Sequence, residues 1–174
     1  MQIILKKMKN RFKFALVSFL ALCFYACIDL DSIKDYTLER ELKETDEYVR
    51  SMLANNENVD TTASGIFYVR LKEGTGPFPE AGDTLSVKYV GYLMNNTIFD
   101  TSLFNQPDST YTYVYKESDV IQGWETMMGM MNKGCKMKFV LPSSLAYGSQ
   151  GAIGIPPYSA LIFVAVMHDI RKRN

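Results

Sequence analysis

Thr84-Leu-Ser-Val-Lys-Tyr-Val-Gly-Tyr-Leu93 is the stretch of sequence that decides the fold. Apolar or aromatic side chains at Leu85, Val87 and Tyr89 alternate with the polar Ser86 and Lys88. Successive side chains of a β-strand point to opposite faces, so this period of two predicts a strand with one buried and one solvated face.

From residue 65 onward the rest of the chain adds strands and only one short helix. Alternating or continuous apolar runs predict strands over residues 66–71, 110–115, 136–141 and 160–167, and a helix over residues 123–130. Parallel strands need repeated crossover helices, which these segments do not provide. The sequence therefore predicts an α+β domain, in which a curved antiparallel sheet of about five strands wraps around one short α-helix.

A polar segment precedes this domain and contains a second predicted helix. Leu38, Leu42, Val49 and Leu53 recur at steps compatible with one helical face, which predicts a helix over residues 36–54. This helix could pack on its own domain, pair with a second copy in a homodimer, or act as a spacer. The expected organisation is a signal peptide at 1–26, an anchor, linker and helical extension at 27–64, and a folded domain at 65–174.

The N-terminus carries the pattern of an export signal. Residues 1–27 hold five lysines or arginines and no acid, and an apolar run over residues 14–26 follows the basic start. That run is too short to span a bilayer, which needs about 20 apolar residues. Ala26-Cys27 resembles the cleavage site of bacterial lipoproteins, which implies lipid attachment at Cys27 and a lipid-anchored location in the cell envelope. The expected membrane is the outer one, with the protein facing either the periplasm or the cell surface. Ordinary signal cleavage is the alternative.

Charge and motif content exclude several function classes. Residues 28–174 carry 14 bases and 19 acids, so no basic face is left for nucleic acid. The chain has no G-x-S-x-G, phosphate loop, H-E-x-x-H or paired-cysteine metal motif, so neither a metal nor a cofactor is expected. We expect Cys135 and His168 to be core residues rather than a catalytic pair.

Aromatic residues recur in short motifs over residues 65 to 170. In order and spacing these motifs resemble the signatures of the FKBP-type peptidyl-prolyl cis-trans isomerases. With its N-terminus the chain is similar to FKBP lipoproteins of the Bacteroidota. The motifs are Val87-Lys-Tyr89-Val-Gly91-Tyr, Ile98-Phe99-Asp100-Thr-Ser102, Val120-Ile121-Gln-Gly123-Trp124-Glu125, Leu145-Ala-Tyr147-Gly148, Ile155-Pro156-Pro157-Tyr-Ser-Ala-Leu161 and Phe163.

The resemblance implies a proline pocket and assigns its residues. Trp124 would form the floor, Tyr147 would offer its hydroxyl and Ile155 its backbone N–H to carbonyls of the peptide, and Asp100 would accept a hydrogen bond from a neighbouring tyrosine. The implied catalytic set is Tyr89, Phe99, Asp100, Trp124, Tyr147 and Phe163. The implied substrate-binding set is Tyr111, Val120, Ile121 and Ile155.

The function implied by the resemblance is catalysis of X-Pro isomerisation in proline-containing segments of exported proteins, without a cofactor. An alternative is a non-catalytic FKBP-like binding or chaperone module that tethers a partner in an envelope complex for gliding or secretion. A purely structural lipoprotein is a third reading, although it would not need the intact aromatic motifs.

Overall fold

The computed structural model describes residues 36–104 and 108–173. Its helices are α2 (Leu38–Ala54) and α3 (Gln122–Gly129), with short 3-10 helices η2 (Ser102–Phe104) and η3 (Ser143–Leu145). Its strands are β1 (Asp60–Thr61), β2 (Phe67–Lys72), β3 (Thr84–Leu93), β4 (Ile98–Thr101), β5 (Tyr111–Val114), β6 (Lys136–Leu141) and β7 (Leu161–Arg171). The predicted signal peptide and Cys27 lie outside the described residues.

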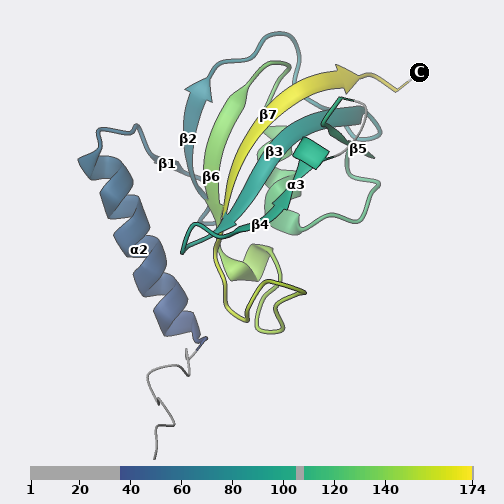
Figure 1. Ribbon diagram of the computed structural model, residues 1–174. Helices are drawn as coiled ribbons and strands as arrows, with labels where there is room; N and C mark the ends of the chain where they lie inside the picture. Colours follow the sequence, from purple (N-terminus) through teal and green to yellow (C-terminus); the bar gives the residue numbers. More distant parts are fainter. Residues whose placement is uncertain (1–35, 105–107, 174) are drawn as a thin grey trace, which may run out of the picture. The chain divides into compact units, whose positions relative to one another are not determined.

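The strands form one antiparallel sheet that curves around α3 (Figure 1). Its order is β1-β2-β6-β7-β3-β4, and β5 pairs with the other end of β3. Strand β3, the stretch predicted first, pairs with β7 over its whole length, from Thr84 against Arg171 to Leu93 against Leu161. The α+β prediction is confirmed. Over the described residues the sheet has seven strands, two more than predicted. The sequence does not predict β1 and β4, because both are too short to give a periodic signal.

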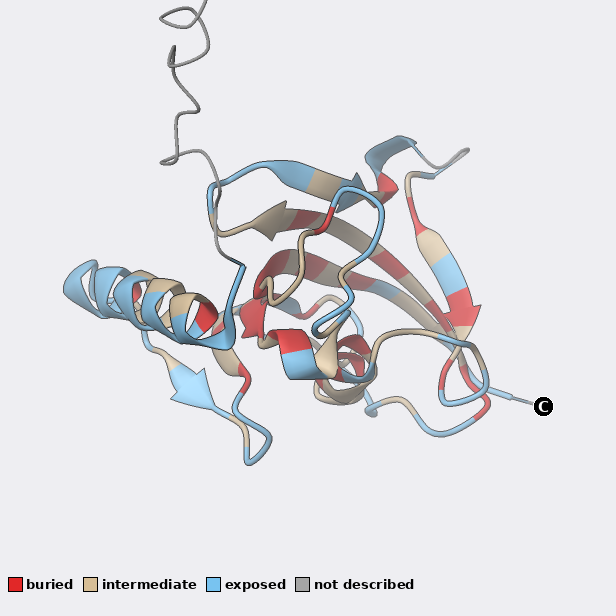
Figure 2. Ribbon diagram, turned by 90° about the horizontal axis from the view of Figure 1, so that it is seen from below, coloured by how far each residue is buried: buried red, intermediate tan, exposed pale blue. Residues whose placement is uncertain are grey.

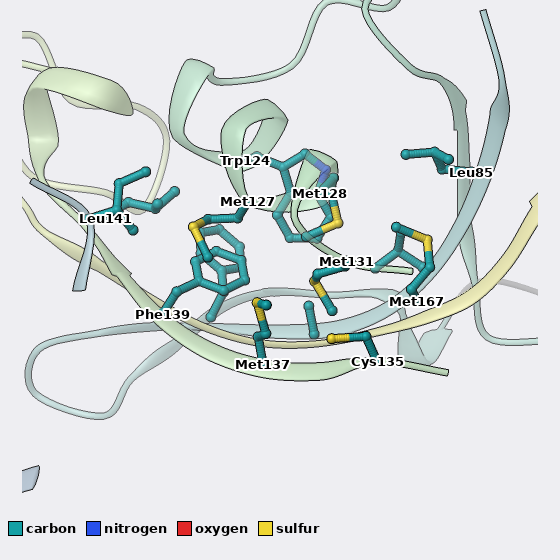
Figure 3. Close-up of a cluster of buried hydrophobic side chains, with 14 of the residues drawn as sticks. Leu85, Trp124, Met127, Met128, Met131, Cys135, Met137, Phe139, Leu141 and Met167 are labelled. Carbon is teal, nitrogen blue, oxygen red and sulfur yellow. The ribbon is translucent and has the colours of Figure 1, made fainter. Parts of the chain in front are cut away.

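The main core lies between α3 and the concave face of the sheet. Trp124, Met127 and Met128 of α3 face the side chains of β6 and β7 in Figure 3. Cys135 is fully buried in this cluster, as predicted, and burial raises the pKa of its thiol. The prediction for His168 is wrong, because this residue is exposed at the bulge between β3 and β7.

Helix α2 packs against the other face of the sheet (Figures 1 and 2). Met52, Tyr48 and Val49 belong to a second apolar cluster, which also contains Val140 of β6 and Ile162 of β7. A side chain of Lys138 on β6 pairs with Glu57 just after the helix. Of the alternatives open for this helix, the structure therefore contains the one in which it docks on its own domain. Residues from Tyr36 onward belong to one compact unit.

The apolar stripe of α2 is not the face that docks on the domain. Leu38, Leu42 and Leu53 are more than half exposed, and only Val49 of that stripe contacts the domain. The docked face instead includes the carboxylate of Glu41, which is buried by a hydrogen-bonding partner far away in the sequence. In the described residues, no helix is both long enough and apolar enough to cross a membrane.

Candidate active site

A pocket of about 530 Å³ opens between the concave face of the sheet, the start of α3 and the segment after β6. Of the ten residues that the resemblance assigns to the site, the structure brings nine to this pocket. The lining residues are Tyr89, Phe99, Asp100, Tyr111, Asp119, Val120, Ile121, Trp124, Ala146, Tyr147 and Phe163. Ile155 is the predicted residue that does not line it.

Trp124 forms the floor because α3 begins just before it. Ile121 has an extended backbone and is the N-cap of the helix, so Trp124 stands in the first turn, directly below the pocket. The indole is only 4% exposed. It makes edge-type contacts with the rings of Tyr89 and Phe163, with centroids 4.9 and 5.2 Å apart. Edge-to-face pairs of this kind are favourable and fix the rings relative to one another.

A β-bulge in β4 supplies two adjacent pocket residues. Gly91 of β3 pairs with Asp100, whereas the next residue, Tyr92, pairs with Ile98. Phe99 is thus the extra residue, and a bulge can turn its side chain to the face that strict alternation would deny it. Consequently both Phe99 and Asp100 reach the pocket, with the ring of Phe99 edge-on to that of Phe163 at 5.5 Å.

Asp100 ties the rim of the pocket together. The hydroxyl of Tyr89 donates to its Oδ2 at 2.5 Å, and the backbone N–H of Thr101 donates to its Oδ1 at 2.8 Å. Burial, followed by the hydrogen bond to Asp100 and its negative charge, raises the pKa of Tyr89 well above the usual range. The phenol therefore stays neutral. Its O–H donates to Asp100 and is not available to a ligand.

Tyr147 supplies the hydroxyl that is free to meet a ligand. It lies in the loop after η3 and is 39% exposed. Within residues 36–104 and 108–173 its hydroxyl has no hydrogen-bond partner, although it lines the pocket. Burial and the nearby charge of Asp100 raise its pKa, so it remains a neutral donor at physiological pH.

The backbone donor expected from Ile155 is not available. Its N–H donates to the carbonyl of Ala152 at 2.9 Å, and the N–H of Ala152 donates back to Ile155 at 2.8 Å, which closes a small turn. The N–H of Ile121 has no acceptor in the described part of the chain, and Ile121 does line the pocket. An N-cap N–H is not used by its own helix, so the start of α3 presents a donor where Ile155 was expected to.

Two lining residues were missed at the sequence level, and both adjoin predicted ones. Asp119 precedes Val120, and Ala146 precedes Tyr147. Asp119 is exposed and forms no ion pair with the described residues. With Asp100 it gives the lining two carboxylates and no lysine, arginine or histidine. An acidic side chain in a loop carries no periodic signal, so the sequence does not identify Asp119 as a site residue.

This arrangement suits binding and torsion of a peptide better than bond cleavage. The lining contains no serine, cysteine, histidine or lysine that could act as a nucleophile. It offers an aromatic floor and walls for a small apolar ring, and two donors, the Tyr147 hydroxyl and the Ile121 N–H, for carbonyl oxygens. A pocket that is mostly apolar with a few convergent polar groups is the usual form of a ligand site.

Comparison with known proteins points in the same direction. Residues 76–167 match the sequence profile described as FKBP-type peptidyl-prolyl cis-trans isomerase. The FKBP-type peptidyl-prolyl cis-trans isomerase FkpA of Aeromonas hydrophila is 38% identical over 130 residues, which are 75% of this chain and 47% of that protein. The peptidyl-prolyl cis-trans isomerase Mip of Coxiella burnetii is 36% identical over 131 residues, 73% of this chain and 55% of that protein. The chain thus spans about half the length of these relatives.

Solved structures give the same likeness. A crystal structure of a peptidyl-prolyl cis-trans isomerase from Pseudomonas syringae superposes with a TM-score of 0.65 at 31% identity, covering 80% of this chain and 99% of that one. The crystal structure of FkpA from Escherichia coli superposes with a TM-score of 0.68 at 30% identity, covering 93% of this chain and 72% of that one.

Proposed function

The chain belongs to the FKBP-type peptidyl-prolyl cis-trans isomerase family, and on this premise we propose that it catalyses cis-trans isomerisation of X-Pro bonds in the pocket above Trp124. The observation that carries the proposal is the pocket itself. The rings of Tyr89, Phe99 and Phe163 enclose a space over the indole. Tyr147 and Ile121 also line it, and each carries a donor without a partner among the described residues. A proline ring would lie on Trp124.

The chemistry needs no nucleophile, because no bond is made or broken. Amide resonance opposes rotation about the X-Pro bond with a barrier of about 18 to 20 kcal/mol, so the unaided reaction takes tens to hundreds of seconds. In the twisted transition state the amide has lost much of its resonance and dipole. A pocket that holds the twisted form better than either planar form lowers the barrier, and a wall of aromatic rings removes the water that favours the planar, more dipolar amide.

The two donors would hold the peptide while the bond turns. In this proposal the Tyr147 hydroxyl and the Ile121 N–H donate to carbonyls that flank the proline, and the role first assigned to the Ile155 N–H passes to Ile121. Asp100 would act indirectly, because its hydrogen bond fixes the Tyr89 ring beside the indole.

The test is the rate of cis-trans exchange of short X-Pro peptides with the full chain, purified in mild detergent. We expect acceleration by the parent, and a loss of about tenfold in kcat/KM for Tyr147→Phe, since a lost hydrogen bond contributes about 1 to 1.5 kcal/mol. Asp100→Ala should lower kcat/KM by the same factor or more. Failure of the parent on every X-Pro peptide tried would refute the proposal, and saturable peptide binding without faster exchange would assign the pocket to tethering.

We further propose that the chain is anchored in the cell envelope through a lipid on Cys27 and acts there on exported proteins. The support is the basic start, the apolar run at 14–26 and the Ala26-Cys27 pair. Cells fed a labelled fatty acid should label the protein, and Cys27→Ser should abolish the label while Cys23→Ser retains it. Label that persists in Cys27→Ser, or a mature protein free of lipid, would contradict the anchor.

We also propose that α2 pairs with a second copy through its exposed leucines. Leu38 and Leu42 lie one turn apart, and 53% and 62% of each is exposed. Residues four apart on a helix are neighbours, so these side chains form one apolar patch. Sedimentation should detect a dimer that Leu42→Lys dissociates and that Lys43→Ala, altered on an adjacent exposed position, leaves intact. A monomer at all concentrations would contradict the pairing.

A further inference from the structure

A buried carboxylate joins helix α2 to the segment that carries Tyr147. Glu41, in the first turn of α2, is only 4% exposed. Its Oε1 accepts from the backbone N–H of Ser143 and its Oε2 from the Ser143 hydroxyl, each at 2.5 Å, across 102 residues of sequence. Burying a carboxylate is unfavourable unless hydrogen bonds compensate it, and no ion pair of the described residues includes Glu41. Both of its oxygens are used on one residue.

Ser143 passes this constraint to the pocket. Its carbonyl accepts the N–H of Ala146 at 2.9 Å and the N–H of Gly148 at 2.8 Å. These two residues bracket Tyr147, and both Ala146 and Tyr147 line the pocket. Ser143 is itself buried at the start of η3. The N–H, hydroxyl and carbonyl of one serine therefore connect α2 on one side to the turn that presents Tyr147 on the other.

Helix α2 is fixed well enough to serve as a support. Near its C-terminal end the side chains of Tyr48 and Met52 are part of the apolar cluster on the sheet. Just beyond that end, Glu57 pairs with Lys138 of β6, whose ammonium group also lies over the Tyr48 ring. These contacts hold the C-terminal half of the 17-residue helix on the sheet, and the bonds of Glu41 to Ser143 fasten its first turn.

We propose that Glu41 is a positioning residue for the pocket, acting through Ser143 to place the Tyr147 hydroxyl for the bound peptide. The inference rests on the proposed isomerase function. It makes α2 a working part of the site, although the sequence alone assigns residues 27–64 to an extension outside the folded domain. A carboxylate is suited to this role, because its two oxygens can accept both donors of Ser143 together, whereas an apolar side chain would leave both unpaired.

The experiment is a double-mutant cycle in the full chain, with Glu41→Gln and Tyr147→Phe. A glutamine side chain can still reach both groups of Ser143, but its NH2 meets the hydroxyl as a donor, so the hydroxyl has to turn its proton away. Glu41→Gln therefore replaces two charge-assisted bonds by neutral ones, which are about half as strong. We expect Glu41→Gln to lower kcat/KM about tenfold in the parent and less than twofold in the Tyr147→Phe background. Glu39→Gln makes the same chemical change on the same turn at an exposed position and should leave kcat/KM unchanged.

A purely structural role for Glu41 would give a different pattern. It would lower kcat/KM by the same factor in both backgrounds, and that result, or no change in the parent, would overturn the proposal. Assays well below the unfolding temperature of each variant keep loss of folded protein out of the comparison.

A second readout is independent of catalysis. The amide resonances of Ala146 and Gly148 report the bonds to Ser143, and the ring resonances of Tyr147 report its placement. We expect Glu41→Gln to shift these signals while those of β3 stay in place. If the parent proves inactive, the proposed function fails, but the chemical shifts still test whether Glu41 positions Tyr147. Unchanged signals at Ala146, Tyr147 and Gly148 would overturn the inference.

Discussion

Replacing Gly91 by alanine should damage both stability and the pocket, because this glycine lies between two pocket rings. Gly91 lies near the end of β3, with Asp100 and Phe163 as its neighbours on the adjoining strands. A Cβ built there would lie 2.7 Å from Cζ of Phe99 and 3.0 Å from Cε1 of Phe163. Carbon atoms prefer about 3.5 to 4.0 Å, so the Phe99 ring has to move by about 1 Å.

The magnitude follows from the cost of overfilling a core. Forced shifts of this kind destabilise by about 1 to 3 kcal/mol, which corresponds to a fall in unfolding temperature of about 3 to 10 °C for a domain of this size. Because the displaced rings are walls of the proline site, we expect kcat/KM to fall about tenfold or more, as 1 to 3 kcal/mol of lost transition-state binding would give. Denaturant unfolding and X-Pro exchange on the same preparation measure both effects.

A second variant tests whether the clash is the cause. Leucine has no atom in the place of Cζ or Cε1, so Gly91→Ala should destabilise the protein less in a Phe99→Leu background than in the parent. Equal destabilisation in both backgrounds, or a Gly91→Ala protein with the stability and activity of the parent, would refute the reasoning.

Three further predictions concern other parts of the molecule. Burial raises the pKa of Tyr89 and Tyr113 in the folded state, so the stability they contribute is complete below pH about 10 and falls as the pH rises above it; a flat unfolding free energy from pH 9 to 12 would contradict this. Asp119→Asn should weaken a preference for peptides with a lysine beside the proline, an effect that 0.5 M salt should also reduce; equal rates for lysine and glutamate peptides in the parent would exclude the preference. Met52→Ala should destabilise by about 2 to 5 kcal/mol through the apolar contact of α2, as denaturant unfolding would measure, and a change below 0.5 kcal/mol would mean that the helix is not docked.

Hydrophobic periodicity predicts most of the helices and strands, because it depends only on neighbouring residues. The alternation of Leu85, Val87 and Tyr89 identified β3, and the other long strands and both α-helices follow from the same kind of signal. Strand β4 was missed because its four residues are too few to give a periodic signal. It also contains a bulge. The bulge is also what places Phe99 and Asp100 together in the pocket.

Long-range partners are what the sequence could not provide. The leucines of α2 mark an apolar face without saying what covers it. In the folded chain Glu41 is buried and Leu42 exposed, because Ser143 offers two donors that only the fold brings near. The donor role of Ile155 was inferred from resemblance and depends on where one N–H points. No pattern of residue types records the direction of a backbone N–H in a loop, so its bond to Ala152 became evident only in three dimensions.

The central claim is that the pocket above Trp124 turns the X-Pro bond rather than only holding the peptide. Exchange spectroscopy on an X-Pro peptide at equilibrium, with a catalytic amount of the full chain, tests this directly. We predict cis-trans exchange far faster than the unaided tens to hundreds of seconds, with the acceleration reduced about tenfold in Tyr147→Phe. Peptide resonances that shift on binding while the exchange rate stays at its unaided value would contradict the claim.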